Sequence, residues 1–173
     1  RKPQCHAGWD WGPCIMVAGI YGEPRLRFFD NARIEHAVIR QEHDADGHVA
    51  ITADVELAAI RNATIPVTFT FGKETVSAEV EVTRAQGGAA TLSLTLYRPE
   101  LWWPAGQGKQ VLHDATVSIP GDRVERKVGL RTVELVAEPD DAGVSMFFRV
   151  NGRDIFAKGA NWIPADALPS RIT

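Results

Sequence analysis

Residues 48–57 read HVAITADVEL, and apolar and polar side chains alternate along them. Polar Thr52, Asp54 and Glu56 stand between apolar neighbours at the odd positions Val49, Ile51, Ala53, Val55 and Leu57. Successive side chains of a β-strand point to opposite faces of the sheet. This period of two therefore predicts a strand with one buried and one solvated face.

The same alternation recurs along the chain. The clear cases are 64–71, 76–82 and 91–96. Weaker patterns cover 33–42, 111–119 and 124–137. Turn signals separate the runs at Asp46-Gly47, Gly72-Lys73, Gly87-Gly88 and Pro120-Gly121-Asp122. About seven short antiparallel strands within about 100 residues are typical of an immunoglobulin-like β-sandwich. We predict that architecture and an all-β fold, without the Cys and Trp residues that pin antibody domains.

Composition limits the function classes. The 173 residues are 45% hydrophobic, which is enough for one full domain and additional segments. A net charge of −3, with Lys and Arg scattered along the chain, provides no basic field for a polyanion, so nucleic acid is excluded as an expected partner. The apolar run 14–20 is far shorter than the roughly 20 residues that cross a bilayer, so no membrane association is expected.

The sequence contains few residues in patterns that bind metals or form disulfides. Cys5 and Cys14 make neither a disulfide framework nor a zinc ligand set, and we expect free thiols. Residues 44–47 read DADG between histidines and match a calcium loop only in its first positions. We predict a solvated hairpin turn there, and no cofactor.

The two ends differ from the middle. Residues 6–13 read HAGWDWGP, and the strand-like runs 15–21 and 25–29 that follow suit the last strands of a preceding β domain. Because the chain opens at Arg1 without a leader pattern, we expect a start inside a longer protein, whose localisation cannot be predicted. Near the other end we expect a hairpin of 146–150 and 154–157 turning at Asn151-Gly152. Its second arm, apolar over 155–157, suits a strand buried on both faces at the start of a parallel barrel.

Three motifs in this order carry a family resemblance. They are GWDWGP at 8–13, LWWP at 101–104 followed by Gly106 and Gly108, and FFRVNG at 147–152 running on to KGANWIPAD at 158–166. Together they resemble the β-mannosidases of glycoside hydrolase family 2. Members have a jelly-roll domain, an immunoglobulin-like sandwich and a (β/α)₈ barrel. The resemblance implies a jelly-roll tail at 1–31, the sandwich at 32–133, and a hairpin with the first barrel strand at 134–173.

The resemblance also implies an activity. The family removes non-reducing terminal β-linked mannose with retention, which requires two carboxyl groups about 5–5.5 Å apart. In the family both are Glu residues on later barrel strands, and the acid/base follows an Asn. No Asn of this chain precedes a Glu, and Glu56, Glu79 and Glu81 occupy outward positions of predicted strands. We therefore expect no catalytic residue within 1–173 and no activity from the isolated chain, whose partners would be the missing domains and a terminal β-mannoside.

Three residues are implied as substrate-binding: Trp9, Asp10 and Asn161. Asp10 would accept hydrogen bonds from sugar hydroxyls, and Trp9 would offer an apolar face to the ring. Asn161 would lie where the first barrel strand ends, as a site residue or as a residue that hydrogen-bonds the strand end. Without the resemblance, Trp9 and Trp11 would be expected in a core and Asp10 in a turn. Ala7 and Cys14 depart from the pattern of many relatives, which leaves the shape of this loop open.

Trp102 and Trp103 admit two interpretations. Adjacent aromatics could stack on sugar rings, but Pro99 and Pro104 around them favour a buried loop that pins two sheets together. Alternatives for the whole chain are a carbohydrate-binding or connector module, or part of another family 2 enzyme acting on β-galactosides, β-glucuronides or glucosaminides. A binding module needs aromatics on an exposed sheet face, and the predicted strands place Thr, Ser, Glu and Asp there instead.

Overall fold

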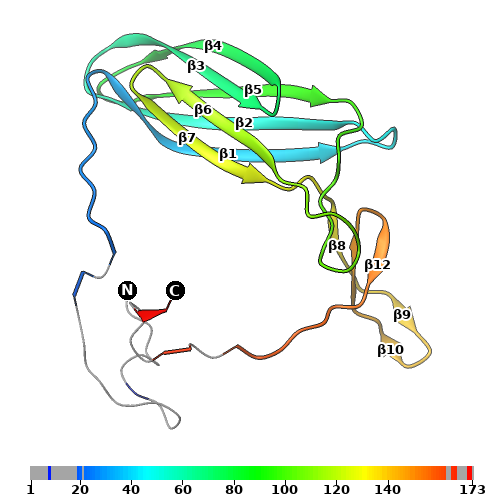
Figure 1. The fold of residues 1–173 in the computed structure, drawn as a ribbon. Coiled ribbons are helices and arrows are strands. Elements are labelled where there is room, and N and C mark those ends of the chain that lie inside the picture. The colour runs from blue at the N-terminus through cyan, green and yellow to red at the C-terminus, as the bar shows by residue number, and fades with distance from the viewer. Residues whose placement is uncertain (1–7, 9–18, 21, 163–164, 167–170, 173) are drawn as a thin grey trace. The chain divides into compact units, whose positions relative to one another are not determined.

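The computed structural model describes residues 8, 19–20, 22–162, 165–166 and 171–172 (Figure 1). The chain forms two compact units, one of residues 29–157 and the other of residues 1–28 with 158–173. The described residues contain twelve β-strands and no α-helix, which confirms the all-β prediction.

Seven strands form a β-sandwich of two antiparallel sheets (Figure 1). The three-stranded sheet has the order β1-β2-β5, with strands Ala32–His43, Val49–Ala59 and Gly88–Leu96. The four-stranded sheet has the order β4-β3-β6-β7, with strands Glu74–Val82, Ala63–Phe71, His113–Ile119 and Asp122–Val128. These seven strands lie where the alternating patterns predicted them, apart from the last, which is shorter.

Alternation determines which side chains enter the core. The first five odd-numbered side chains of β2, from Val49 to Leu57, are at most 3% exposed, and Val67, Phe69 and Phe71 of β3 are at most 1% exposed. The outward positions pair across strands as hydroxyls, with Thr52 3.1 Å from Ser93 and Thr68 2.9 Å from Ser77. Each sheet therefore packs its apolar face against the apolar face of the other sheet, and its outer face carries pairs of polar side chains across neighbouring strands.

A β-bulge explains why the sequence pattern of β1 is weak. The register against β2 shifts between Ile34 and His36. Ala32 and Ile34 are buried before the shift, whereas Ala37 and Ile39 contact the core after it. One extra residue moves the inward positions from even to odd numbers, so a strict period of two cannot span the strand.

A smaller three-stranded sheet follows the sandwich, in the order β12-β11-β8, with strands Arg153–Ile155, Phe147–Val150 and Val133–Val136. The hairpin β9 (Pro139–Asp140) and β10 (Gly143–Val144) lies between β8 and β11 in sequence. The turn between β11 and β12 lies at Asn151-Gly152 as predicted, and both residues have positive φ.

Three strand predictions need correction. The expected strand 124–137 is two strands in different sheets, because residues 129–132 leave the ladder and bury Leu130 completely. The expected strand 25–29 is not formed, since no described strand pairs with it. Residues 155–157 are not a strand buried on both faces: β12 ends at Ile155 on the edge of its sheet, and Phe156 beyond it is 83% exposed.

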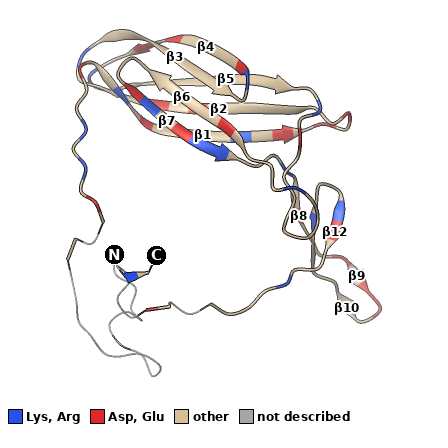
Figure 2. Ribbon diagram, viewed as in Figure 1, with Lys and Arg blue, Asp and Glu red and all other residues tan. Residues whose placement is uncertain are grey.

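Charges of both signs alternate over the sandwich strands (Figure 2). Arg40 of β1 pairs with Asp54, Lys127 of β7 pairs with Asp114, and Arg123 of the same strand lies 3.4 Å from Glu125. Mixed pairing leaves no single-sign field of the kind that attracts nucleic acid. No helix in the described part of the chain has the length and apolar character needed to cross a membrane.

Candidate functional site

The residues predicted to bind sugar fall outside the sandwich. Trp9 and Asp10 lie outside the described residues. Asn161 is exposed and belongs to the unit of residues 1–28 and 158–173, as does Trp162, which is 87% exposed. Neither of the two belongs to the described hydrophobic core.

Three glutamates of the sandwich strands are solvated. Glu56, Glu79 and Glu81 are exposed on the outer faces, as the alternation predicted, and the Glu81 carboxylate accepts a hydrogen bond of 2.6 Å from the Thr64 hydroxyl. No polar or charged residue is buried among the residues described. A glycosidase acid relies on a low-dielectric pocket to stay protonated near neutral pH, and these three exposed glutamates have no such environment.

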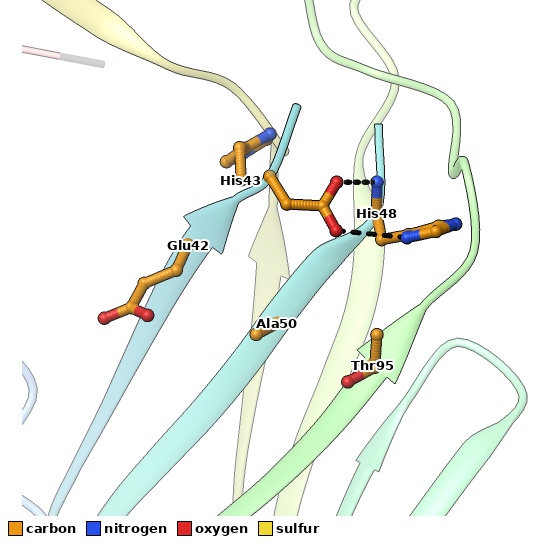
Figure 3. Close-up of a pocket in the computed structure, with 6 residues that line it drawn as sticks. Glu42, His43, His48, Ala50 and Thr95 are labelled. Carbon is orange, nitrogen blue, oxygen red and sulfur yellow. Dashed lines mark hydrogen bonds and ion pairs between the residues drawn. The ribbon is translucent and has the colours of Figure 1, made fainter. Parts of the chain in front are cut away.

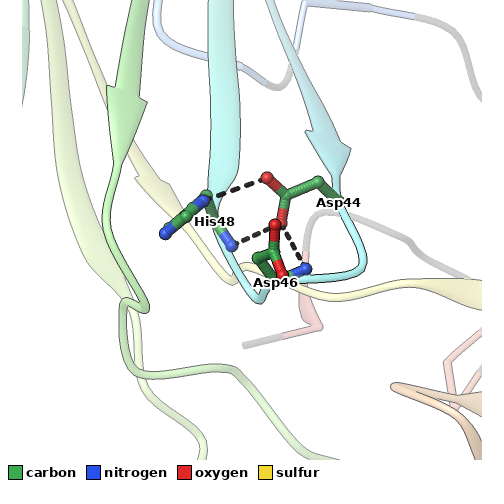
Figure 4. A group of neighbouring side chains, drawn as sticks. All are labelled: Asp44, Asp46 and His48. Atoms are coloured by element: carbon green, nitrogen blue, oxygen red, sulfur yellow. Dashed lines mark hydrogen bonds and ion pairs between the residues drawn. The ribbon is translucent and has the colours of Figure 1, made fainter.

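The β1–β2 turn brings together Asp44, Asp46 and His48, whose ligand-type atoms lie within 4.8 Å of one another (Figure 4). The Asp44 carboxylate accepts hydrogen bonds from the backbone N–H groups of Asp46 at 3.0 Å and His48 at 2.7 Å, and its second oxygen lies 3.1 Å from His48 Nδ1. These bonds are those of a closed hairpin turn, as predicted.

The pKa of Asp44 is lowered. Desolvation by the surrounding chain would raise this pKa, but the hydrogen bonds and charge of His48, with the N–H of Asp46, outweigh it. Asp44 is therefore a carboxylate at neutral pH, with its oxygens already engaged. A general acid needs the opposite shift, so the pKa of Asp44 is not shifted in the direction that a glycosidase acid requires.

An open hollow of about 290 Å³ adjoins this turn, lined by Glu42, His43, Asp44, His48, Ala50 and Thr95 (Figure 3). Partial burial lowers the pKa of His43, whose Nε2 donates to Gln41 Oε1 at 2.9 Å. A second hollow of about 610 Å³ lies beside the β4–β5 turn and is lined mainly by small residues and charged Glu35, Glu56 and Arg84. Neither hollow is lined by Trp, Tyr or Phe, the side chains on which sugar rings stack.

Trp102 and Trp103 form a structural junction. The Arg131 guanidinium lies 4.8 Å from the centroid of the Trp102 ring, and that of Arg153 lies 4.6 Å from the centroid of Trp103. A Cβ at Gly129 would come within 2.8 Å of the Trp102 ring, so glycine is required for this packing. One face of each indole is therefore occupied by an arginine, which opposes the sugar-stacking interpretation.

Asn151 joins this loop to the small sheet. Its side-chain N–H donates to the Trp102 carbonyl at 3.0 Å, and its Oδ1 accepts from the Thr132 N–H at 2.9 Å. The Asn151 N–H in turn donates to the Thr132 carbonyl at 3.1 Å. The loop that carries Trp102 and Trp103 (the tryptophan loop) thus connects the sandwich to the β12-β11-β8 sheet. The sequence predicted that this loop joins two sheets but did not indicate which two.

The fold defines the class as an immunoglobulin-like β-sandwich with a short attached sheet. Residues 32–131 match the model of glycosyl hydrolases family 2. The chain is 40% identical over 182 residues to "Beta-mannosidase B" of Emericella nidulans, and this match covers 100% of the chain and 21% of the relative. The chain belongs to glycosyl hydrolases family 2.

Solved structures agree with this assignment. A β-D-mannosidase from Dictyoglomus thermophilum matches 100% of the chain and 22% of its own, with a TM-score of 0.87 and 31% identity. The exo-chitosanase CsxA of Amycolatopsis orientalis matches 78% of the chain and 16% of its own, with a TM-score of 0.63 and 25% identity. The chain thus spans about a fifth of the length of the curated relatives that it matches.

Proposed function

We propose that the chain is an internal part of a retaining exo-β-mannosidase that hydrolyses terminal β-D-mannose residues of oligosaccharides. Residues 1–31 would end a jelly-roll domain, 32–133 would form the connecting sandwich, and 134–173 would enter the catalytic barrel. The supporting observation is that 40% identity to a protein named as a β-mannosidase extends over 100% of the chain. The similarity therefore includes both flanks and not only the widely shared sandwich.

In this proposal the sandwich is non-catalytic. The acid/base and nucleophile are Glu residues beyond Thr173, because no Asn-Glu pair occurs in the chain and Glu56, Glu79 and Glu81 are exposed on the outer faces of the strands. Trp9 and Asp10 supply one wall of the mannose pocket, and Asn161 contributes from the first barrel strand. An exposed Asn161 is compatible with that role.

The test uses the full-length protein and p-nitrophenyl β-D-mannopyranoside. We expect hydrolysis by the full-length protein and none by residues 1–173. Asp10→Asn should lower kcat/KM by about 10–100-fold, since a hydrogen bond to a charged group contributes about 1.5–3 kcal/mol. Asp30→Asn is the matched control, because Asp30 is an exposed carboxylate outside the proposed pocket.

Two results would contradict the proposal. Hydrolysis by the purified 173-residue chain would place catalytic groups inside it. An unchanged kcat/KM in Asp10→Asn, Trp9→Ala and Asn161→Ala together would remove these residues from the substrate site.

A second candidate is an exo-acting family 2 enzyme for glucosaminides. It is favoured by the match to the exo-chitosanase, which extends over 78% of the chain. Parallel assays with p-nitrophenyl β-mannoside and β-glucosaminide distinguish the two, since the larger kcat/KM identifies the sugar that the pocket fits. A carbohydrate-binding module would instead give heat on titration of residues 1–173 with millimolar mannose or mannobiose, and we expect none.

A further inference from the structure

The β12-β11-β8 sheet has two unlike faces. Residues directly opposite each other in antiparallel strands share a face. Phe148 lies opposite both Leu135 and Ile155. Val150, two residues further along the strand, is on the same side and lies opposite Val133 and Arg153, whose guanidinium packs on the Trp103 ring at the edge of this face. We call Val133, Leu135, Phe148 and Ile155 the apolar face.

The apolar face is accessible in this chain. Val133 is 54% exposed and Leu135 is 58% exposed, whereas Phe148 and Ile155 are half-buried. Phe156, directly after the last strand, is 83% exposed. Contiguous exposed side chains of this size mark an interaction surface more often than a solvated one.

The opposite face carries ion pairs beside Phe147 and the buried Val136, which lie opposite each other. Arg149 lies 2.6 Å from Asp154 and 3.9 Å from Glu134, on the strands to either side of its own. The Arg149 guanidinium also lies 5.6 Å from the centroid of the Phe147 ring. This face has its own ion pairs. On the apolar face the end near Val150, which is 5% exposed, is covered, whereas Val133 and Leu135 remain more than half exposed among the described residues.

Hydrogen bonds hold the sheet to the sandwich. The connecting residues 129–132 are bonded by Gln41 of β1, by the Trp102 N–H, which donates to Leu130 at 2.8 Å, and by Asn151 of the sheet's own turn. Leu130 is anchored in the sandwich core with no exposed surface. A linker bonded at each residue holds the apolar face in one orientation relative to the sandwich.

We propose that the apolar face is a preformed docking surface for the remainder of the same polypeptide, the barrel domain that the proposed function places after Thr173. The relatives support this occupant: the match to the Dictyoglomus thermophilum structure includes the whole chain and yet only 22% of that protein. A three-stranded sheet whose apolar face is only partly covered is not a complete two-layer unit, and the rest of the covering layer must come from elsewhere. Intramolecular docking incurs no loss of translational entropy, which favours the same chain over a second molecule.

The test measures thiol accessibility in the full-length protein with its native cysteines replaced by serine. Leu135→Cys and Val133→Cys report on the apolar face. Glu134→Cys is the matched control, because Glu134 is the exposed residue between them and points to the opposite face. Maleimide labelling is followed by mass spectrometry, for the full-length protein and for residues 1–173.

We expect the thiols at 133 and 135 to react at least about 10-fold more slowly in the full-length protein than in residues 1–173, as for a site that must open before it reacts. The thiol at 134 should react equally fast in both. Equal rates at 133 and 135 in the two proteins would overturn the proposal. Protection that disappears on dilution would assign the face to a second copy and overturn it as well. Because labelling does not depend on substrate, a protein that lacks β-mannosidase activity but protects these thiols contradicts the proposed function alone.

Discussion

Asp44 closes the β1–β2 hairpin with a single side chain. One carboxylate oxygen accepts from two backbone N–H groups and the other lies beside the His48 imidazole (Figure 4). The same turn is supported from the next loop, where the Arg98 side chain donates from Nε to the Asp46 carbonyl at 3.1 Å. Asp44 therefore stabilises the turn by accepting hydrogen bonds from its backbone N–H groups. The ionisation of its carboxyl group is linked to the stability of the hairpin.

Removing the charge of Asp44 should change how stability depends on pH. The folded pKa of Asp44 lies below its ordinary value of 3.8, so its contribution is complete above that value and is lost as the pH falls through the folded pKa. In Asp44→Asn the stability should no longer fall as the pH drops through the pKa of Asp44. The urea midpoint at pH 6 should be lower than in the native chain. Asp46→Asn is the control, because no hydrogen bond joins its carboxylate to the turn backbone in the described structure. Identical pH profiles for Asp44→Asn and the native chain would contradict the linkage.

The connection between sandwich and small sheet is the element that departs most from the sequence pattern. Valine and threonine on both sides of Gly129 continue a strand-like composition, so one strand was predicted over 124–137. In the structure the Gln41 side chain takes the place of a neighbouring strand. Its Oε1 accepts from the Arg131 N–H at 2.8 Å, and its Nε2 donates to the Gly129 carbonyl at 3.4 Å.

Gln41→Ala should therefore destabilise the junction. It leaves the Arg131 N–H and one bond of the Gly129 carbonyl unmade, and we expect a loss of about 1–2 kcal/mol in the free energy of unfolding. Urea unfolding followed by tryptophan fluorescence measures the effect, because Trp102 packs against Gly129. Glu42→Ala, an exposed neighbour on the same strand, should stay within about 0.5 kcal/mol of the native chain. Equal stabilities of the two variants would show that the Gln41 bonds contribute nothing net.

The two sheets of the sandwich share one hydrophobic core. One core cluster includes buried residues from both sheets and Leu130 from the connection. Phe69 and Phe71 lie at its centre, with ring centroids 6.3 Å apart in an edge-to-face arrangement. A core that belongs to both sheets cannot lose one sheet and keep the other, so we expect a single unfolding transition.

Phe69→Ala should lower the free energy of unfolding by about 3–5 kcal/mol, because a fully buried aromatic side chain leaves a cavity. Circular dichroism and tryptophan fluorescence should report the same lowered urea midpoint. Phe28→Ala is the control, since Phe28 is 88% exposed and should leave the transition unchanged. A separate transition for the two signals would show that the sheets, or the sheet and the tryptophan loop, unfold independently.

The amino-acid sequence by itself determined six sandwich strands, the start of the seventh, the Asn151-Gly152 turn and the family. Period-two burial and turn chemistry are local properties, and motif order is carried by the chain itself. Tertiary structure alone decided the bulge in β1 and the break at residues 129–132. It also decided the packing of an arginine on each tryptophan, and the apolar face that lies on the other side of the small sheet from Arg149. Each of these depends on which residues meet across strands far apart in sequence, and a linear pattern contains no register between such strands.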